Sequence, residues 1–151
     1  MHNCLVGSEM CIRDRFSWEI NGFETRQQDL TWLIAHEFTH SLHFNVYTWH
    51  QLKGAAWKRE GYAEYIARCW KNDGRLLIKI RQWQEEAKKE HKGIPVIVLE
   101  DGTIQSLAYF RFGLMTQYAM EIAGMNYLEL YDDEQSFEEI YQAMIAWAAQ
   151  Q

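Results

Sequence analysis

The sequence predicts a mainly helical domain with a small amount of β structure. Long segments without proline carry apolar residues every three or four positions, which is the spacing of one face of a helix. Two short stretches, 16–25 and 94–99, are rich in aromatic and β-branched residues and favour strands instead. The chain has 151 residues, of which 48% are hydrophobic, so it can bury a core and a single domain is the default.

The first fifteen residues stand apart from the rest of the chain. The stretch CLVGSEMCIRDR, residues 4–15, resembles a string at the ends of many unrelated predicted proteins, where it looks like translated sequencing adapter. We therefore expect residues 1–15 to be a non-native segment and residues 16–151 to form the domain. Three cysteines without regular spacing do not make a disulfide framework, and the lack of a CxxC motif argues against a thiolate zinc site.

The first elements of the domain are a hairpin and a long helix. Asn21-Gly22 lies between the two short runs of 16–25 and predicts a two-residue β-hairpin, the remnant of a larger sheet. Residues 26–47 contain neither Gly nor Pro and predict a helix, followed by a loop near 48–54. Further apolar residues widen its apolar stripe, so we expect this helix in the domain interior. The stripe consists of Leu30, Ile34, Phe38 and Leu42.

Two more helices are predicted at 55–70 and 75–91, before the only proline of the chain. A turn is predicted at 72–74 between them. The second has an i, i+4 pair, Glu85 and Lys89, and we expect Gly93 to cap it and Pro95 to stop it. Its apolar stripe is Leu76, Ile80, Trp83 and Ala87.

The C-terminal third begins with IPVIVL, residues 94–99, which predicts a buried strand and then a turn. Residues 103–124 predict one long helix that ends at Gly124. Ser136 and Glu139 have the spacing of a capping box, so we expect the last helix to start there and to run to about Ala149.

Charge and hydropathy exclude two classes of partner. The formal net charge is -6, whereas a nucleic-acid-binding surface needs clustered Lys and Arg. No apolar run approaches the roughly 20 residues that span a bilayer, so we expect no transmembrane segment.

The run HEFTH, residues 36–40, carries the strongest functional signal. A helix turns about 100° and rises about 1.5 Å per residue, so His36 and His40 project within about 40° of each other and about 6 Å apart along the axis. Both imidazoles can bind one ion, and Glu37 can reach a water on that ion as a general base. The alternative is two partly buried histidines that hydrogen-bond to their neighbours.

A catalytic zinc ion takes three protein ligands and keeps one position open. The metzincin pattern HExxHxxGxxH does not fit, because the chain has His43 and Val46 where Gly and His are needed. The other common solution is a glutamate from the next helix, and Glu60 in WKREGYAEY is the predicted third ligand. The rival third ligand is His50, and the alternative for Glu60 is a solvated helix charge.

Two residues near Glu60 extend this prediction. Glycine inside a helix costs about 1 kcal/mol relative to alanine, so Gly61 predicts a close approach of the two helices at the metal. Glu64 lies one turn after Glu60 and is predicted to accept a hydrogen bond from the free ring nitrogen of a ligand histidine. The remaining histidines of the domain are predicted to be surface or loop residues: His43, His50 and His91.

HEFTH followed by WKREGYAEY resembles the gluzincin branch of zinc metallopeptidases. The pattern is most similar to that of the peptidase MA-like family, HE-[LF]-[TA]-H, a spacer, and W-x-x-EG-x-AEY. The stretch LAYFRFGLMTQYAMEIAG, residues 107–124, is similar to a later helix of that family. The resemblance covers about residues 28–145 and implies a zincin-like helical core, in which the HExxH helix pairs with a glutamate-bearing second helix.

The resemblance also implies a role for each matching residue. His36, His40 and Glu60 become the zinc ligands, and Glu37 becomes the general base. Tyr109 becomes a candidate hydrogen-bond donor to the oxyanion, with Tyr118 and Tyr62 as its competitors. Gluzincins carry a substantial sheet before the metal helix, whereas only 16–25 precedes it here, so we expect a domain that is incomplete at its N-terminus.

These observations predict a zinc-dependent metallopeptidase with Zn²⁺ as cofactor and a peptide or protein as substrate. It would hydrolyse peptide bonds through a zinc-bound water activated by Glu37. The alternative is a zinc-binding, catalytically silent gluzincin-like module. A third alternative is a metal-free helical interaction domain. In that case the joint occurrence of His36, Glu37, His40 and Glu60 would be a coincidence.

Overall fold

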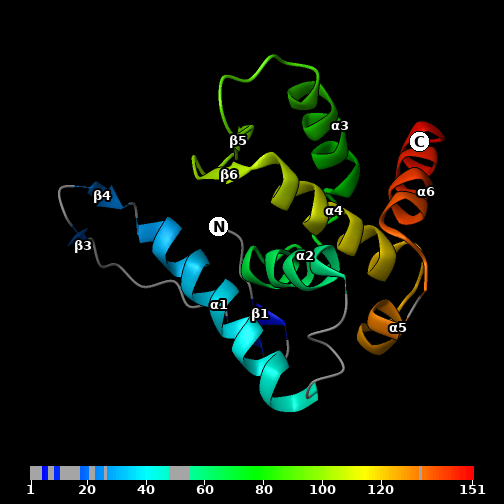
Figure 1. Cartoon of the computed structure of the whole chain (residues 1–151), viewed down its shortest axis with the longest axis horizontal. Coiled ribbons are helices and arrows are strands. Elements are labelled where there is room, and N and C mark those ends of the chain that lie inside the picture. The colour runs from blue at the N-terminus through cyan, green and yellow to red at the C-terminus, as the bar shows by residue number, and fades with distance from the viewer. Residues whose placement is uncertain are drawn as a thin grey trace.

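The computed structural model describes residues 5–6, 9–10, 18–20, 23–25, 27–47, 55–132 and 134–151. This part of the chain is mainly helical, as predicted (Figure 1). Consecutive strands pair antiparallel into two-stranded sheets, β1 with β2, β3 with β4 and β5 with β6. The elements are β1 (Leu5–Val6), β2 (Glu9–Met10), β3 (Trp18–Ile20), β4 (Phe23–Thr25), α1 (Gln27–Tyr47), α2 (Ala56–Ala67), α3 (Leu76–Ala87), β5 (Val96–Val98), β6 (Ile104–Ser106), α4 (Leu107–Glu121), α5 (Tyr127–Asp132) and α6 (Phe137–Ala149).

Several predicted elements are confirmed. Strands β3 and β4 pair with Ile20 opposite Phe23, so Asn21-Gly22 separates two paired strands. Helices α1, α2, α3 and α6 lie within the predicted ranges, and the Ser136–Glu139 capping box is present at the start of α6. The loop predicted at 48–54 lies outside the described residues.

The region from α3 to α4 differs from the prediction in three ways. Helix α3 ends at Ala87, well before Gly93 and Pro95, and Ala87 is exposed rather than part of the buried stripe. Residues 103–124 do not form one helix, because β6 first pairs with β5 and α4 begins only at Leu107. Strand β5 buries only Ile97, because its other face is turned to solvent.

One smaller expectation also fails, and two features were not predicted. The predicted Glu85–Lys89 pair is replaced by two i, i+3 pairs at 2.6 Å, Glu85 with Lys88 and Glu86 with Lys89. The short helix α5 was not predicted. Cys69 takes part in a disulfide bond, although the odd number of cysteines makes no framework.

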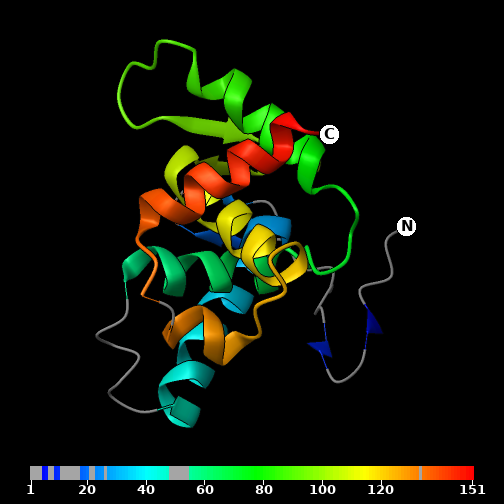
Figure 2. The same ribbon diagram turned by 90° about the vertical axis from the view of Figure 1, so that its right-hand side faces the viewer.

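Helix α4 is the centre of the described fold. It packs on α2, α3, α5 and α6, and in Figures 1 and 2 it runs through the middle of the molecule. Four of its apolar residues are fully buried: Phe110, Leu114, Met115 and Ala119. Helix α2 lies between α4 and α1, so it joins the core to the helix that carries HEFTH.

The contact between α2 and α4 depends on two glycines. A Cβ atom on Gly61 would lie 2.4 Å from the backbone oxygen of Phe112 and 2.5 Å from Oγ1 of Thr116. A Cβ on Gly113 of α4 would lie 3.1 Å from Cβ of Glu64 on α2 and 2.7 Å from the Trp70 ring just after α2. The close approach predicted from Gly61 is therefore real, but the partner is α4 and not the HEFTH helix, so that part of the prediction was wrong.

Helix α1 does not lie in the domain interior as expected, and it buries a different face from the predicted apolar stripe. Ile34 and Phe38 are 54% and 61% exposed, and Leu42 is also exposed, whereas His36 and Thr39 are buried. The face that packs on α2 is thus the one that carries the histidine, and the apolar stripe faces outward in the described structure. No described helix is both long and apolar enough to cross a membrane.

Candidate metal centre

Helices α1 and α2 bring together the three predicted ligands. Nε2 of His36 lies 3.1 Å from Nε2 of His40, and each of these nitrogens lies 3.3 Å from Oε2 of Glu60. The histidines share one face because they are one turn apart on α1, and Glu60 faces them because α2 packs against that face. Figure 1 shows the two helices beside each other.

The triangle formed by these three atoms has the size of a face of a zinc coordination sphere. Tetrahedral zinc with nitrogen and oxygen ligands at about 2.0–2.1 Å keeps its ligand atoms about 3.3–3.4 Å apart. The observed separations of 3.1 and 3.3 Å are close to that value. His36 is buried, whereas His40 and Glu60 are partly exposed, so the open side of the triangle borders on solvent. Two imidazoles and one carboxylate are a donor set that suits zinc and related divalent metals.

Glu64 lies next to the ring nitrogen of His36 that faces away from the triangle. Its Oε1 atom is 3.4 Å from Nδ1 of His36, and the side chain is fully buried. Its other oxygen, Oε2, accepts hydrogen bonds from three donors: Arg68 Nε at 3.0 Å, Trp32 Nε1 at 3.3 Å and Gln105 Nε2 at 2.5 Å. Glu64 therefore connects the first histidine to α2 and to strand β6.

The charges around His36 affect its protonation. Burial lowers the pKa of His36, but the hydrogen bond and charge of Glu64 and the charge of Glu60 more than offset this, so the pKa is raised above its usual value. A metal ion at Nε2 would therefore have to compete with a proton in the metal-free protein.

Glu37 and Tyr109 are the two predicted catalytic residues beside the ligands. Glu37 is exposed. Tyr109, in the first turn of α4, is 39% exposed, and its ring centroid lies 6.3 Å from that of His36. Partial burial, followed by the charges of Glu60, Glu64 and Glu37, raises the pKa of Tyr109, so its hydroxyl stays protonated and is available as a donor.

The competitors of Tyr109 lie elsewhere. Tyr118 packs against Trp147 with ring centroids 6.0 Å apart, on the side of α4 that faces α6. Tyr62 packs against His43 at 4.9 Å. Of the three candidates, Tyr109 is the one whose ring lies near the ligand histidines.

The prediction that His43 is a surface or loop residue was wrong. His43 is partly buried on α1, and its ring lies 4.9 Å from the rings of Tyr62 and Tyr127 and 6.0 Å from that of Tyr131. Burial, and then the charge of His40, lowers the pKa of His43 to about 4. His91 approaches the backbone oxygen of Glu86 at the end of α3. His50, the rival third ligand, lies outside the described residues.

The three residues that donate hydrogen bonds to Glu64 were not predicted from the sequence. Trp32 and Arg68 are each one helical turn from a predicted site residue, His36 and Glu64, so helix spacing was an available signal for both. Gln105 is 41 positions from Glu64 on a different element, and no local pattern pointed to it.

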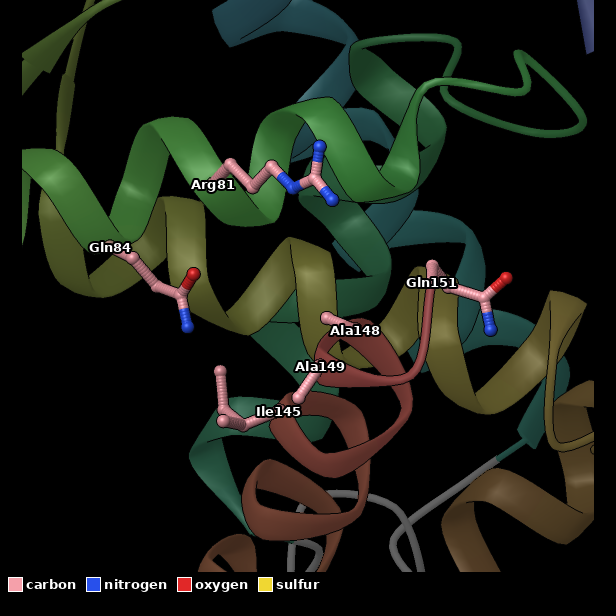
Figure 3. Close-up of a pocket in the computed structure, with 6 residues that line it drawn as sticks. All are labelled: Arg81, Gln84, Ile145, Ala148, Ala149 and Gln151. Carbon is pink, nitrogen blue, oxygen red and sulfur yellow. The ribbon is translucent and has the colours of Figure 1, made fainter.

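A cavity of about 300 Å³ lies away from the metal centre, between α3 and α6. Figure 3 shows Arg81 and Gln84 on α3 across from Ile145 and Ala149 on α6. Arg81 is the only charged side chain in its lining, so this cavity offers none of the acid–base or metal-ligating groups found at the His36 centre.

No family model, no curated protein and no solved structure matches this chain.

Proposed function

We propose that this chain is the metal-binding core of a zinc-dependent peptidase of the gluzincin type. The observation that carries the proposal is the triangle of His36, His40 and Glu60, whose edges of 3.1 and 3.3 Å fit the ligand spacing of tetrahedral zinc. These three side chains form a group with the composition and spacing of a metal site among the residues that the structure describes.

When bound there, zinc supplies a Lewis acid that polarises a carbonyl group and lowers the pKa of water to about 7. His36, His40 and Glu60 would hold the ion. Glu37, which extends from the turn between the two histidines into solvent, takes the proton of the attacking water and delivers it to the leaving amine. Tyr109 donates a hydrogen bond to the oxygen on which negative charge develops.

The exposure of Glu37 favours a peptidase over a catalytically silent zinc module. A structural zinc site uses four protein ligands and has no need of a base. Here the group offers three ligands, and Glu37, next to His36 in the chain, is exposed and not part of the group.

The experiment that tests the proposal measures zinc and peptide hydrolysis on the same sample. The full chain is purified without added metal and analysed for zinc per chain, and is then assayed on a mixed peptide library before and after chelation. We expect about one zinc per chain and cleavage that chelation abolishes and zinc restores. A folded chain with zinc but without cleavage would indicate the silent module. A folded chain that takes up no zinc would contradict the proposal.

A further inference from the structure

Gln105 has an unusual environment for a glutamine. Its side chain lies on strand β6 and is only 3% exposed. Its amide nitrogen donates to Oε2 of Glu64 at 2.5 Å, whereas its amide oxygen has no hydrogen-bond partner in the described structure. The orientation of the amide follows from this contact, because an oxygen in that position would be repelled by the carboxylate. A buried polar atom without a partner costs stability, so fold stability alone does not explain a glutamine here.

The hydrogen bonds of Glu64 are divided unequally between its two oxygens. All three donors, from Gln105, Arg68 and Trp32, reach Oε2. Oε1 lies 3.4 Å from Nδ1 of His36, within ion-pair distance, and neither of these two buried atoms has a hydrogen-bond partner among the described residues. The carboxylate is thus held by one oxygen, and the other is left for the imidazole.

This arrangement favours a proton on Nδ1 of His36. A carboxylate oxygen only accepts hydrogen bonds, and both ring nitrogens face one, because Nε2 also lies 3.3 Å from Oε2 of Glu60. Glu64 is fully buried whereas Glu60 is partly exposed, so the contact with Glu64 is less screened by solvent and the neutral ring is expected to carry its proton on Nδ1. Nε2, which lies in the triangle with His40 and Glu60, then keeps its lone pair for a metal.

We infer that Gln105 is a positioning residue of the metal centre, which acts on His36 through Glu64. Its amide holds the Glu64 carboxylate so that Oε1 faces Nδ1 of His36, and strand β6 thereby contributes to a site whose ligands come from α1 and α2. The inference deepens the proposed function and rests on it for its catalytic meaning, but the positioning itself does not require a bound metal.

The first test reads the tautomer of His36 in the metal-free full chain by ¹⁵N NMR of its imidazole, at a pH where the ring is neutral. We expect the Nδ1–H tautomer in the parent, and a shift toward a mixture of tautomers in Gln105→Met, which keeps the size of the side chain and removes the donor. A parent ring protonated on Nε2 would overturn the inference without any variant. An unchanged tautomer in a folded Gln105→Met protein would also overturn it.

The second test measures the zinc dissociation constant by competition with a chromophoric chelator. Loss of an outer-shell partner typically weakens metal binding about 10–100-fold, and we expect Glu64→Gln in that range and Gln105→Met near about tenfold. The matched control is Gln82→Met, because Gln82 donates to the backbone oxygen of Val98 in the same hairpin but does not touch Glu64. This control should bind zinc as the parent does.

A double-mutant cycle separates positioning from a general loss of structure. If Gln105 acts through Glu64, then Gln105→Met has no further effect on zinc affinity in the Glu64→Gln background. Effects that add in full would overturn the inference. If the parent binds no zinc but shows the Nδ1–H tautomer and its dependence on Gln105, the proposed function fails while the positioning role stands.

Discussion

Nε2 of His36 and Oε2 of Glu60 lie 3.3 Å apart, although the two residues are 24 positions apart in the chain and on different helices. This distance depends on the packing of α2 against the polar face of α1, which itself depends on the contact of α2 with the central helix α4. The geometry of the candidate metal centre therefore depends on the packing of the core. Its predicted properties can be tested by substitutions at the ligands, at the open side and in the packing that supports the ligands.

The third ligand is tested by Glu60→Ala. Removing a ligand leaves two histidines to hold the ion, so we expect zinc affinity to fall by more than the roughly 10–100-fold cost of losing an outer-shell partner. Glu138→Ala is the control, since Glu138 is exposed on α6 and contacts only Gln142 among the partners that the structure describes. Competition titration with a chelator gives both affinities. Unchanged affinity in Glu60→Ala would place the third ligand elsewhere.

The general base is tested by Glu37→Gln, which keeps the size of the side chain and removes its basicity. Because Glu37 is exposed and is not one of the three ligands, we expect zinc content to be unchanged while kcat falls by about 10²–10⁴-fold. Zinc analysis and peptidase rates on one preparation provide the measurement. Turnover equal to that of the parent would refute the assignment.

Tyr109→Phe tests the hydrogen bond to the developing oxyanion. An oxyanion donor contributes about 10²–10³-fold in kcat, and we expect about 10–10²-fold here because Tyr109 is exposed and competes with solvent. KM should change little. Tyr118→Phe, on the face of α4 that packs on Trp147, is the matched control and should keep full activity. The assignment is wrong if both variants behave alike.

His43 should make the fold less stable in mild acid. Its pKa of about 4 in the folded protein lies below its usual value of 6.5, so the unfolded chain binds the proton first as the pH falls. Stability is therefore lost between about pH 6.5 and 4. The full difference corresponds to about 3 kcal/mol, and partial exposure of His43 reduces the expected loss to about 1–2 kcal/mol.

Urea unfolding at several pH values measures this loss. His43→Phe should remove it, whereas His91→Gln at the end of α3 should retain it. His36 works in the opposite direction, because its raised pKa stabilises the metal-free fold below about pH 6.5 and this contribution is lost as the pH rises. The difference between parent and His43→Phe isolates His43, and parallel pH profiles would contradict the prediction.

Gly61→Ala tests the packing that carries Glu60. Helix propensity alone predicts a gain of about 1 kcal/mol, but the new methyl group would lie 2.4 Å from a backbone oxygen of α4. We expect a net loss of about 1–3 kcal/mol in urea unfolding. Adding Thr116→Ala should recover only part of it, because the oxygen of Phe112 belongs to the backbone and remains. A more stable Gly61→Ala protein would show that α2 and α4 can separate at little cost.

The sequence by itself determined the local features of this protein. The pairing of His36 with His40 follows from helix geometry, the start of α6 follows from the Ser136–Glu139 capping box, and the β3–β4 hairpin follows from Asn21-Gly22. Each depends on residues within a few positions of each other, where the backbone alone sets the distances. The second motif, WKREGYAEY, also predicted Glu60 as a ligand, and helix periodicity placed Glu64 one turn later on the same face.

Only the tertiary structure decided which surfaces meet. It turned the apolar stripe of α1 outward and its histidine face inward, directed Gly61 to α4, and brought Gln105 to Glu64 from another element. The physical reason is that the buried face of a helix depends on which neighbour offers the better-packed and better-paired surface. That neighbour is distant in the chain, so local periodicity carries no information about it.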